Sequence, residues 1–198
     1  MSSEFVLFES QVLSLALIEK ELYQLYTNLS EKVEDVSAKT LLSYIATDSL
    51  KHSTILATII DEVGGSKAQE SNCAVNIMYN KELIESLTKK VSKSKNVSRQ
   101  GLISLIDTLS GFEDLLHNEY RRAFRLKFNL YADYGLRKDE EKELNIFNLI
   151  VDDEERHQKI LLSLARLCDK KLSFKSDSPI VKYQRPDSWY VPPKGHRP

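Results

Sequence analysis

The sequence predicts an all-α protein, a bundle of four long helices, and two observations lead to that prediction. Apolar residues recur at intervals of three and four over long stretches, which is the period of one face of a helix. The chain of 198 residues contains only six glycines and five prolines, which favours long uninterrupted elements. We expect one domain over residues 1–171 and an extended tail over residues 172–198.

The first two predicted helices form a hairpin over about 4–34 and 38–63. Ser37 is the predicted N-cap of the second helix, which Gly64 and Gly65 would end. The short link implies antiparallel neighbours. Residues 65–96 follow as a longer polar connection, with a possible short helix around 81–90, and this connection can cross the end of the bundle.

The last two predicted helices form a second hairpin over about 98–133 and 139–170. Ser98 is the expected cap of the first of them, and Gly135 should break it. The tail holds all five prolines together with Tyr183, Trp189 and Tyr190. Its composition resists regular structure, so we expect an extended segment docked on the bundle or on a neighbouring subunit.

The helices carry four inward-facing stripes that form two repeating pairs. Each stripe combines apolar residues with ligand-type residues at the same spacing as its counterpart. One pair consists of Phe8, Val12, Leu15, Glu19, Leu22 and Tyr26, matched by Leu102, Ile106, Leu109, Glu113, Leu116 and Tyr120. The other consists of Leu42, Ile45, Ser49, His52, Leu56 and Ile59, matched by Phe147, Ile150, Glu154, His157, Leu161 and Leu164.

Charged groups on these stripes predict a metal site inside the bundle. Buried carboxylates and imidazoles are costly unless they are compensated, and metal ions compensate several at once. The candidate ligands are Glu19, His52, Glu113, Glu154 and His157. Two alternatives remain open, namely a core histidine at His52 and a solvated charged face around Glu154 and His157.

Three further residues have two interpretations each. His117 lies one turn beyond Glu113, so it is either a sixth metal ligand or hydrogen-bond donor, or a partly exposed helix histidine. Tyr26 and Tyr120 could hydrogen-bond to ligand carboxylates or pass electrons, although packing is the preferred interpretation. Cys168 continues the last stripe and is expected in the core; with Cys73 it forms neither a Cys-x-x-Cys motif nor a disulfide framework.

Composition argues against several partners. A net charge of −1 provides no basic stripe for nucleic acid, and no apolar run is long enough to cross a membrane. The first residues lack the basic region of a secretion signal, so a cytoplasmic location is expected.

The order of these motifs resembles the ferritin-like superfamily, most closely its rubrerythrin-like di-iron carboxylate proteins. LALIEKELYQLY and TLSGFEDLLHNEY are similar to that family's lone-glutamate helices, and IVDDEERHQKIL is similar to its Glu-x-x-His helix. The resemblance implies a ferritin-like four-helix bundle with a long crossover. It also implies one metal bound by Glu19, His52 and Glu154, and another bound by Glu113, His157 and Glu154.

One residue departs from the family pattern. Ser49 stands where a second bridging glutamate would be, so three carboxylates would face two divalent ions. A hydroxide or oxide bridge could fill the gap, or the site could hold a single ion. Asp48 is not a simple substitute, since one residue turns it about 100° around the helix.

The resemblance implies a metal-binding oxidoreductase that uses iron, with manganese as the other option. It would reduce peroxide or oxidise Fe(II), assemble as a homo-oligomer, and need an external electron donor because the chain lacks the cysteines of a rubredoxin centre. The alternative is a non-enzymatic bundle whose one-ion or degenerate site serves assembly or partner binding.

Overall fold

A computed structural model describes residues 3–62, 75–134 and 140–169 of the chain. Within these ranges every regular element is a helix, and no strand is present. The elements in order are α1 (Ser3–Lys32), α2 (Val36–Glu62), α3 (Val75–Lys93), α4 (Arg99–Tyr134) and α5 (Glu140–Cys168). The all-α prediction is therefore confirmed for the described residues.

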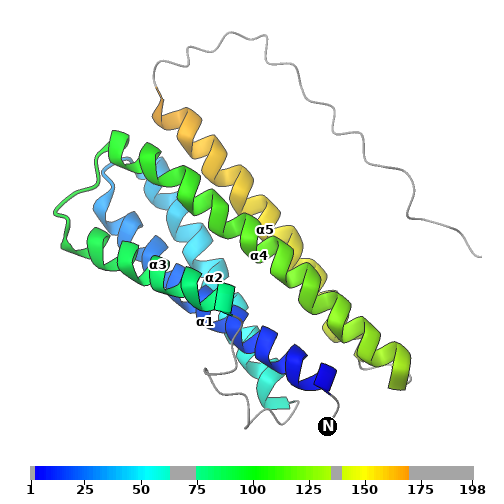
Figure 1. Cartoon of the computed structure of the whole chain (residues 1–198). Helices are drawn as coiled ribbons and strands as arrows, with labels where there is room; N and C mark the ends of the chain where they lie inside the picture. The colour runs from blue at the N-terminus through cyan, green and yellow to red at the C-terminus, as the bar shows by residue number, and fades with distance from the viewer. Residues whose placement is uncertain (1–2, 63–74, 135–139, 170–198) are drawn as a thin grey trace, which may run out of the picture.

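The helices pack as a bundle of two pairs with one additional helix (Figure 1). The most extensive packing joins α1 to α2 and α4 to α5, as expected for two hairpins. The two pairs meet through α1 with α4 and, less extensively, through α2 with α5. In the connection, α3 is longer than the expected short helix, and it packs along α1 instead of only crossing the end of the bundle.

The predicted N-cap residue is correct for α4 and wrong for α2. The Ser98 hydroxyl accepts a hydrogen bond from the backbone N–H of Gly101 at 3.1 Å, which confirms the expected cap of α4. At α2 the cap is Asp35, whose Oδ1 accepts from the N–H of Ala38 at 2.9 Å. Ser37 lies inside the helix instead, and the side chain of Asp35 satisfies one of the free N–H groups of the first turn.

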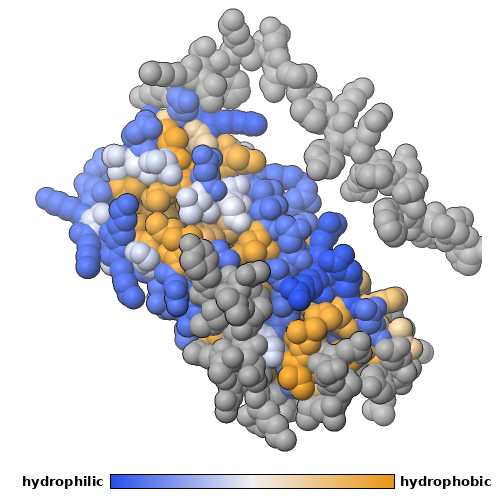
Figure 2. Space-filling model, in the orientation of Figure 1, coloured by the Kyte–Doolittle hydropathy of each residue, from blue (hydrophilic) through white to orange (hydrophobic). Residues whose placement is uncertain are grey.

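The four stripes form the core. None of their residues is more than 4% exposed, including the ionisable ones. Cys168 is also buried, as expected. Figure 2 shows the contrasting outer surface, where hydrophilic side chains surround separate hydrophobic areas. The spacing of apolar residues therefore predicted which face of each helix is inward.

Several sequence predictions fall outside the described residues. They concern the glycines 64, 65 and 135 as helix breakers, Cys73, and the tail over 172–198. Among the helices that the structure describes, none is both long and apolar enough to cross a membrane.

Candidate metal centre

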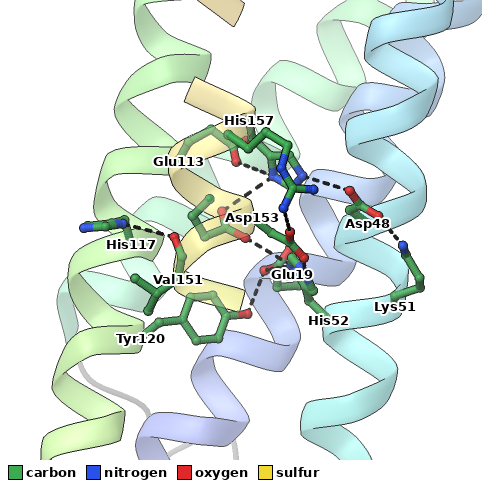
Figure 3. A network of polar contacts seen from close by, with 12 residues as sticks. Glu19, Asp48, Lys51, His52, Glu113, His117, Tyr120, Val151, Asp153 and His157 are labelled. Atoms are coloured by element: carbon green, nitrogen blue, oxygen red, sulfur yellow. Dashed lines mark hydrogen bonds and ion pairs between the residues drawn. The ribbon is translucent and has the colours of Figure 1, made fainter. Parts of the chain in front are cut away.

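Five side chains from four helices converge in the bundle, and Figure 3 labels all of them except Glu154. Glu19 comes from α1, His52 from α2, Glu113 from α4, and Glu154 and His157 from α5. They form two groups whose potential ligand atoms lie within 4.8 Å of one another. We call Glu19, His52 and Glu154 the first position, and Glu113, His157 and Glu154 the second position, so Glu154 belongs to both.

Each histidine turns the same ring nitrogen toward the carboxylates. In the first position, His52 Nδ1 lies 3.1 Å from Glu19 Oε1 and 3.0 Å from Glu154 Oε1. In the second, His157 Nδ1 lies 3.1 Å from Glu113 Oε2 and 3.9 Å from Glu154 Oε2. The two ring centroids are 6.0 Å apart. Both Nδ1 atoms and the shared carboxylate therefore face one compact space.

Three carboxylate oxygens in this space lack a hydrogen-bond donor among the described residues. They are both oxygens of Glu154 and Oε2 of Glu19, and all three are buried. Unsatisfied buried polar atoms are rare in folded proteins, because they lose hydration without replacing it. A bound cation would satisfy all three, so the donor set fits one or two metal ions.

Two buried tyrosines hold the lone glutamates from the opposite hairpin. The Tyr120 hydroxyl donates to Glu19 Oε1 at 2.7 Å, and the Tyr26 hydroxyl donates to Glu113 Oε1. Both rings are fully buried, so the tyrosines pack the core as preferred from the sequence and also orient the carboxylates. Each bond joins α1 to α4 across the bundle.

Two aspartates whose role was not predicted from the sequence contact the histidines on their other ring nitrogen. His52 Nε2 lies 3.2 Å from Asp153 Oδ2, and His157 Nε2 lies 3.3 Å from Asp48 Oδ2. Carboxylates in this place fix the orientation of metal-binding imidazoles. Asp153 is 25% exposed at its side chain.

Each aspartate is in turn paired with a cation on the outer side. Asp48 pairs with Lys51 and Asp153 with Arg156, and Arg156 also donates to the Tyr44 hydroxyl at 2.8 Å. A signal for these residues exists in the sequence. Asp48 and Lys51 match Asp153 and Arg156 at the same offset that relates the two histidines, so the repeat extends beyond the inward stripes.

The converging charges shift the pKa values of the site. Burial alone would lower the pKa of His52, but the carboxylates of Glu154 and Glu19 beside its ring raise it to about 10. The same balance with Glu113 and Glu154 raises the pKa of His157 to about 11. Burial and repulsion from Glu19 and Glu113 raise the pKa of Glu154 to about 8. Without metal, the protein therefore balances these carboxylates with protons.

His117 and Ser49 have distinct places. His117 is half-buried and lies outside both groups; its Nδ1 is 3.3 Å from the backbone oxygen of Val151, away from the cluster (Figure 3). The structure therefore does not bring this sixth candidate to the other five. Ser49 is 1% exposed and lies on the inward stripe of α2, where the repeat places it opposite Glu154.

Comparison with known proteins adds no relative. No family model matches the sequence, and no match was found among curated proteins or solved structures.

Proposed function

We propose that this protein is a ferritin-like, rubrerythrin-like metal protein that binds two ions at the first and second positions. The observation that supports this most directly is the environment of Glu154. Its Oε1 lies 3.0 Å from Nδ1 of His52 and its Oε2 lies 3.9 Å from Nδ1 of His157, and neither oxygen has a hydrogen-bond partner among the described residues. A carboxylate buried in this way is suited to bridging two cations, one at each oxygen.

The donor atoms favour iron or manganese. Carboxylate and imidazole ligands suit these ions, whereas the described residues provide no thiolate at the cluster. When bound, a pair of such ions supplies two-electron chemistry toward peroxide or oxygen.

The surrounding residues have defined tasks in this proposal. Asp48 and Asp153 would accept from the Nε2–H groups and leave each Nδ1 free to hold a metal ion, while the buried tyrosines orient the lone glutamates.

The proposed reaction is reduction of peroxide or oxidation of Fe(II). Both need access by a small substrate only, which is consistent with ligands that are no more than 3% exposed. The chain has two cysteines in total, too few for a four-cysteine iron centre. Electrons for peroxide reduction would therefore come from an external donor.

Metal content and activity test this proposal together. Protein purified from its own host should contain close to two equivalents of iron or manganese per chain. The iron-loaded protein should consume peroxide or oxidise Fe(II), and His157→Ala should lose most of that activity because it removes a ligand. His117→Ala is the matched control, since His117 lies on the outer side of the cluster and should leave both metal content and rate unchanged.

A second candidate function is favoured by Ser49. With one bridging carboxylate absent, a single ion could stabilise a bundle that serves assembly or partner binding. A stoichiometry near one, with equal rates for the parent and His157→Ala, would support this alternative and refute the two-ion redox proposal.

A further inference from the structure

We propose that a carboxylate-bearing small anion, of the size of acetate, completes the metal site beside Ser49. The inference rests on the proposed function, because it concerns the ligand that the two metal ions would share with the protein. It assigns the ligand's chemical class and its position, neither of which follows from the presence of metal alone.

The position follows from the internal repeat. Ser49 and Glu154 both follow an aspartate by one residue and precede a histidine by three. The structure preserves this equivalence, because Asp48 and Asp153 each contact the histidine of the other helix. Since both flanking residues keep equivalent contacts, the side chain at position 49 points to the cluster from α2 as Glu154 does from α5.

The charge follows from the ligand set. Glu19, Glu113 and Glu154 together supply −3, whereas two divalent ions bring +4. Both ions would lie among side chains that are nearly inaccessible to water, so the residual positive charge would be poorly solvated. One additional monoanion at the shared position removes this imbalance.

The size follows from the substitution itself. Glutamate in place of serine would add about one CH2 and one carboxylate, which is nearly the composition of acetate. A carboxylate also has two oxygens that can bind one ion each, as proposed for Glu154. Hydroxide would supply the charge, but it lacks the second oxygen and the volume of the missing side chain. The Ser49 hydroxyl can donate a hydrogen bond to the bound anion.

The positive side chains nearest the cluster lie on the side of α2 and α5, so we expect an anion to approach from this side. Here the residues that support the site reach solvent, with Lys51 61% and Arg156 50% exposed at their side chains. The two cations lie outside the aspartates, so an approaching anion meets positive charge first. The first position is the more accessible, because Asp153 is 25% exposed while Asp48 is 3% exposed.

The test is a metal titration of the full-length protein with Mn(II) or Fe(II) under anaerobic conditions. Titrations in sodium acetate and in sodium chloride, at equal pH and ionic strength, are compared for the parent, Ser49→Ala, Ser49→Glu and Ser49→Asp. We expect acetate to raise the affinity for the second equivalent of metal about tenfold in the parent, a typical coupling between two ligands. Ser49→Ala should keep most of this effect.

The carboxylate variants give the opposite expectation. Ser49→Glu should bind two ions tightly in chloride and should no longer respond to acetate, because its own carboxylate occupies the place. If the glutamate side chain of Ser49→Glu overpacks the core and prevents folding, the shorter Ser49→Asp provides the same comparison. Ser30→Asp is the matched control. It adds a charge at another buried serine, about 16 Å from Glu19 along α1, and should keep the acetate response.

Failure of this inference is distinct from failure of the proposed function. If the parent binds two ions equally well in both salts, a hydroxide bridge suffices and the proposed anion is wrong. The same conclusion follows if folded Ser49→Glu and Ser49→Asp respond to acetate as the parent does. If the folded parent binds no metal in either salt, the proposed function itself fails, and the anion inference is overturned with it.

Discussion

The two halves of the bundle, α1 with α2 and α4 with α5, are two versions of one design, and they differ at a single ligand. Each has a lone glutamate held by a tyrosine, and a histidine held by an aspartate that pairs with a cation. The difference lies in the third contribution. α5 supplies Glu154 to both positions, whereas α2 supplies Ser49.

Several smaller differences accompany this loss. Glu113 has a partner for each oxygen, whereas Oε2 of Glu19 has none among the described residues. Asp48 is buried, and Asp153 is partly open to solvent. The paired contacts on each histidine and lone glutamate therefore maintain the geometry even where one ligand is replaced. We expect Glu154 to be indispensable for this reason.

The largest expected effect comes from Glu154→Ala. Because Glu154 is the only carboxylate common to both groups, its loss should remove both metals, whereas Glu19→Ala should weaken mainly the first position. Metal content after gel filtration measures the difference. Glu155→Ala is the matched control, since this neighbour is exposed and pairs with Lys159. Retention of one tightly bound ion in folded Glu154→Ala would show that the positions do not share this ligand.

Much of this comparison could be predicted from the sequence because helices make spacing interpretable. The period of three and four fixed the inward faces, and so it brought together Glu19, His52 and Glu154 from three helices. The repeat then identified Ser49 as the exceptional residue. These results depend only on which face of a helix is buried, and that is the property the apolar pattern encodes most directly.

The second largest effect should come from the aspartates. Asp48→Asn and Asp153→Asn each keep an oxygen acceptor but lose the charge that holds an imidazole, and such changes typically weaken metal binding about 10–100-fold. We expect the greater loss for Asp48→Asn, because water can partly replace the more exposed Asp153. Competition with a metal chelator measures both affinities, with exposed Asp152→Asn as the control. Equal losses would mean that exposure does not distinguish the two halves.

The contacts of these aspartates could not be predicted from one helix face. Asp48 and Asp153 lie at the edge of the inward stripe, and their contacts depend on how closely α2 approaches α5. His117 is a similar case. Whether its ring faces the metal cluster or a backbone oxygen depends on the orientation of the ring, which the spacing of residues along the helix does not determine. Side chains at the boundary between two helices therefore need the packed structure.

Metal-free protein should lose stability as the pH rises from about 7 to 10. The pKa values of His52 and His157 are raised to about 10 and 11 from an ordinary 6.5, so their protonation stabilises the fold fully below pH 6.5. This stabilisation disappears as the pH rises through the folded-state values. Thermal unfolding of chelator-treated protein measures the trend. His52→Gln should flatten it and His117→Gln should not; a flat curve for the parent would contradict the proposed protonation.

The smallest effect should come from the two tyrosine hydroxyls. Tyr26→Phe and Tyr120→Phe each remove a buried hydrogen bond to a carboxylate and should destabilise metal-free protein by about 1–3 kcal/mol. Tyr120→Phe should also weaken the first position more than the second, because Glu19 then keeps only its contact with His52. Urea unfolding and metal titration measure the two effects, and half-buried Tyr23→Phe is the control. If both variants weakened the two positions equally, the hydroxyls would act on the bundle as a whole, and the distinction between the halves would rest on Ser49 alone.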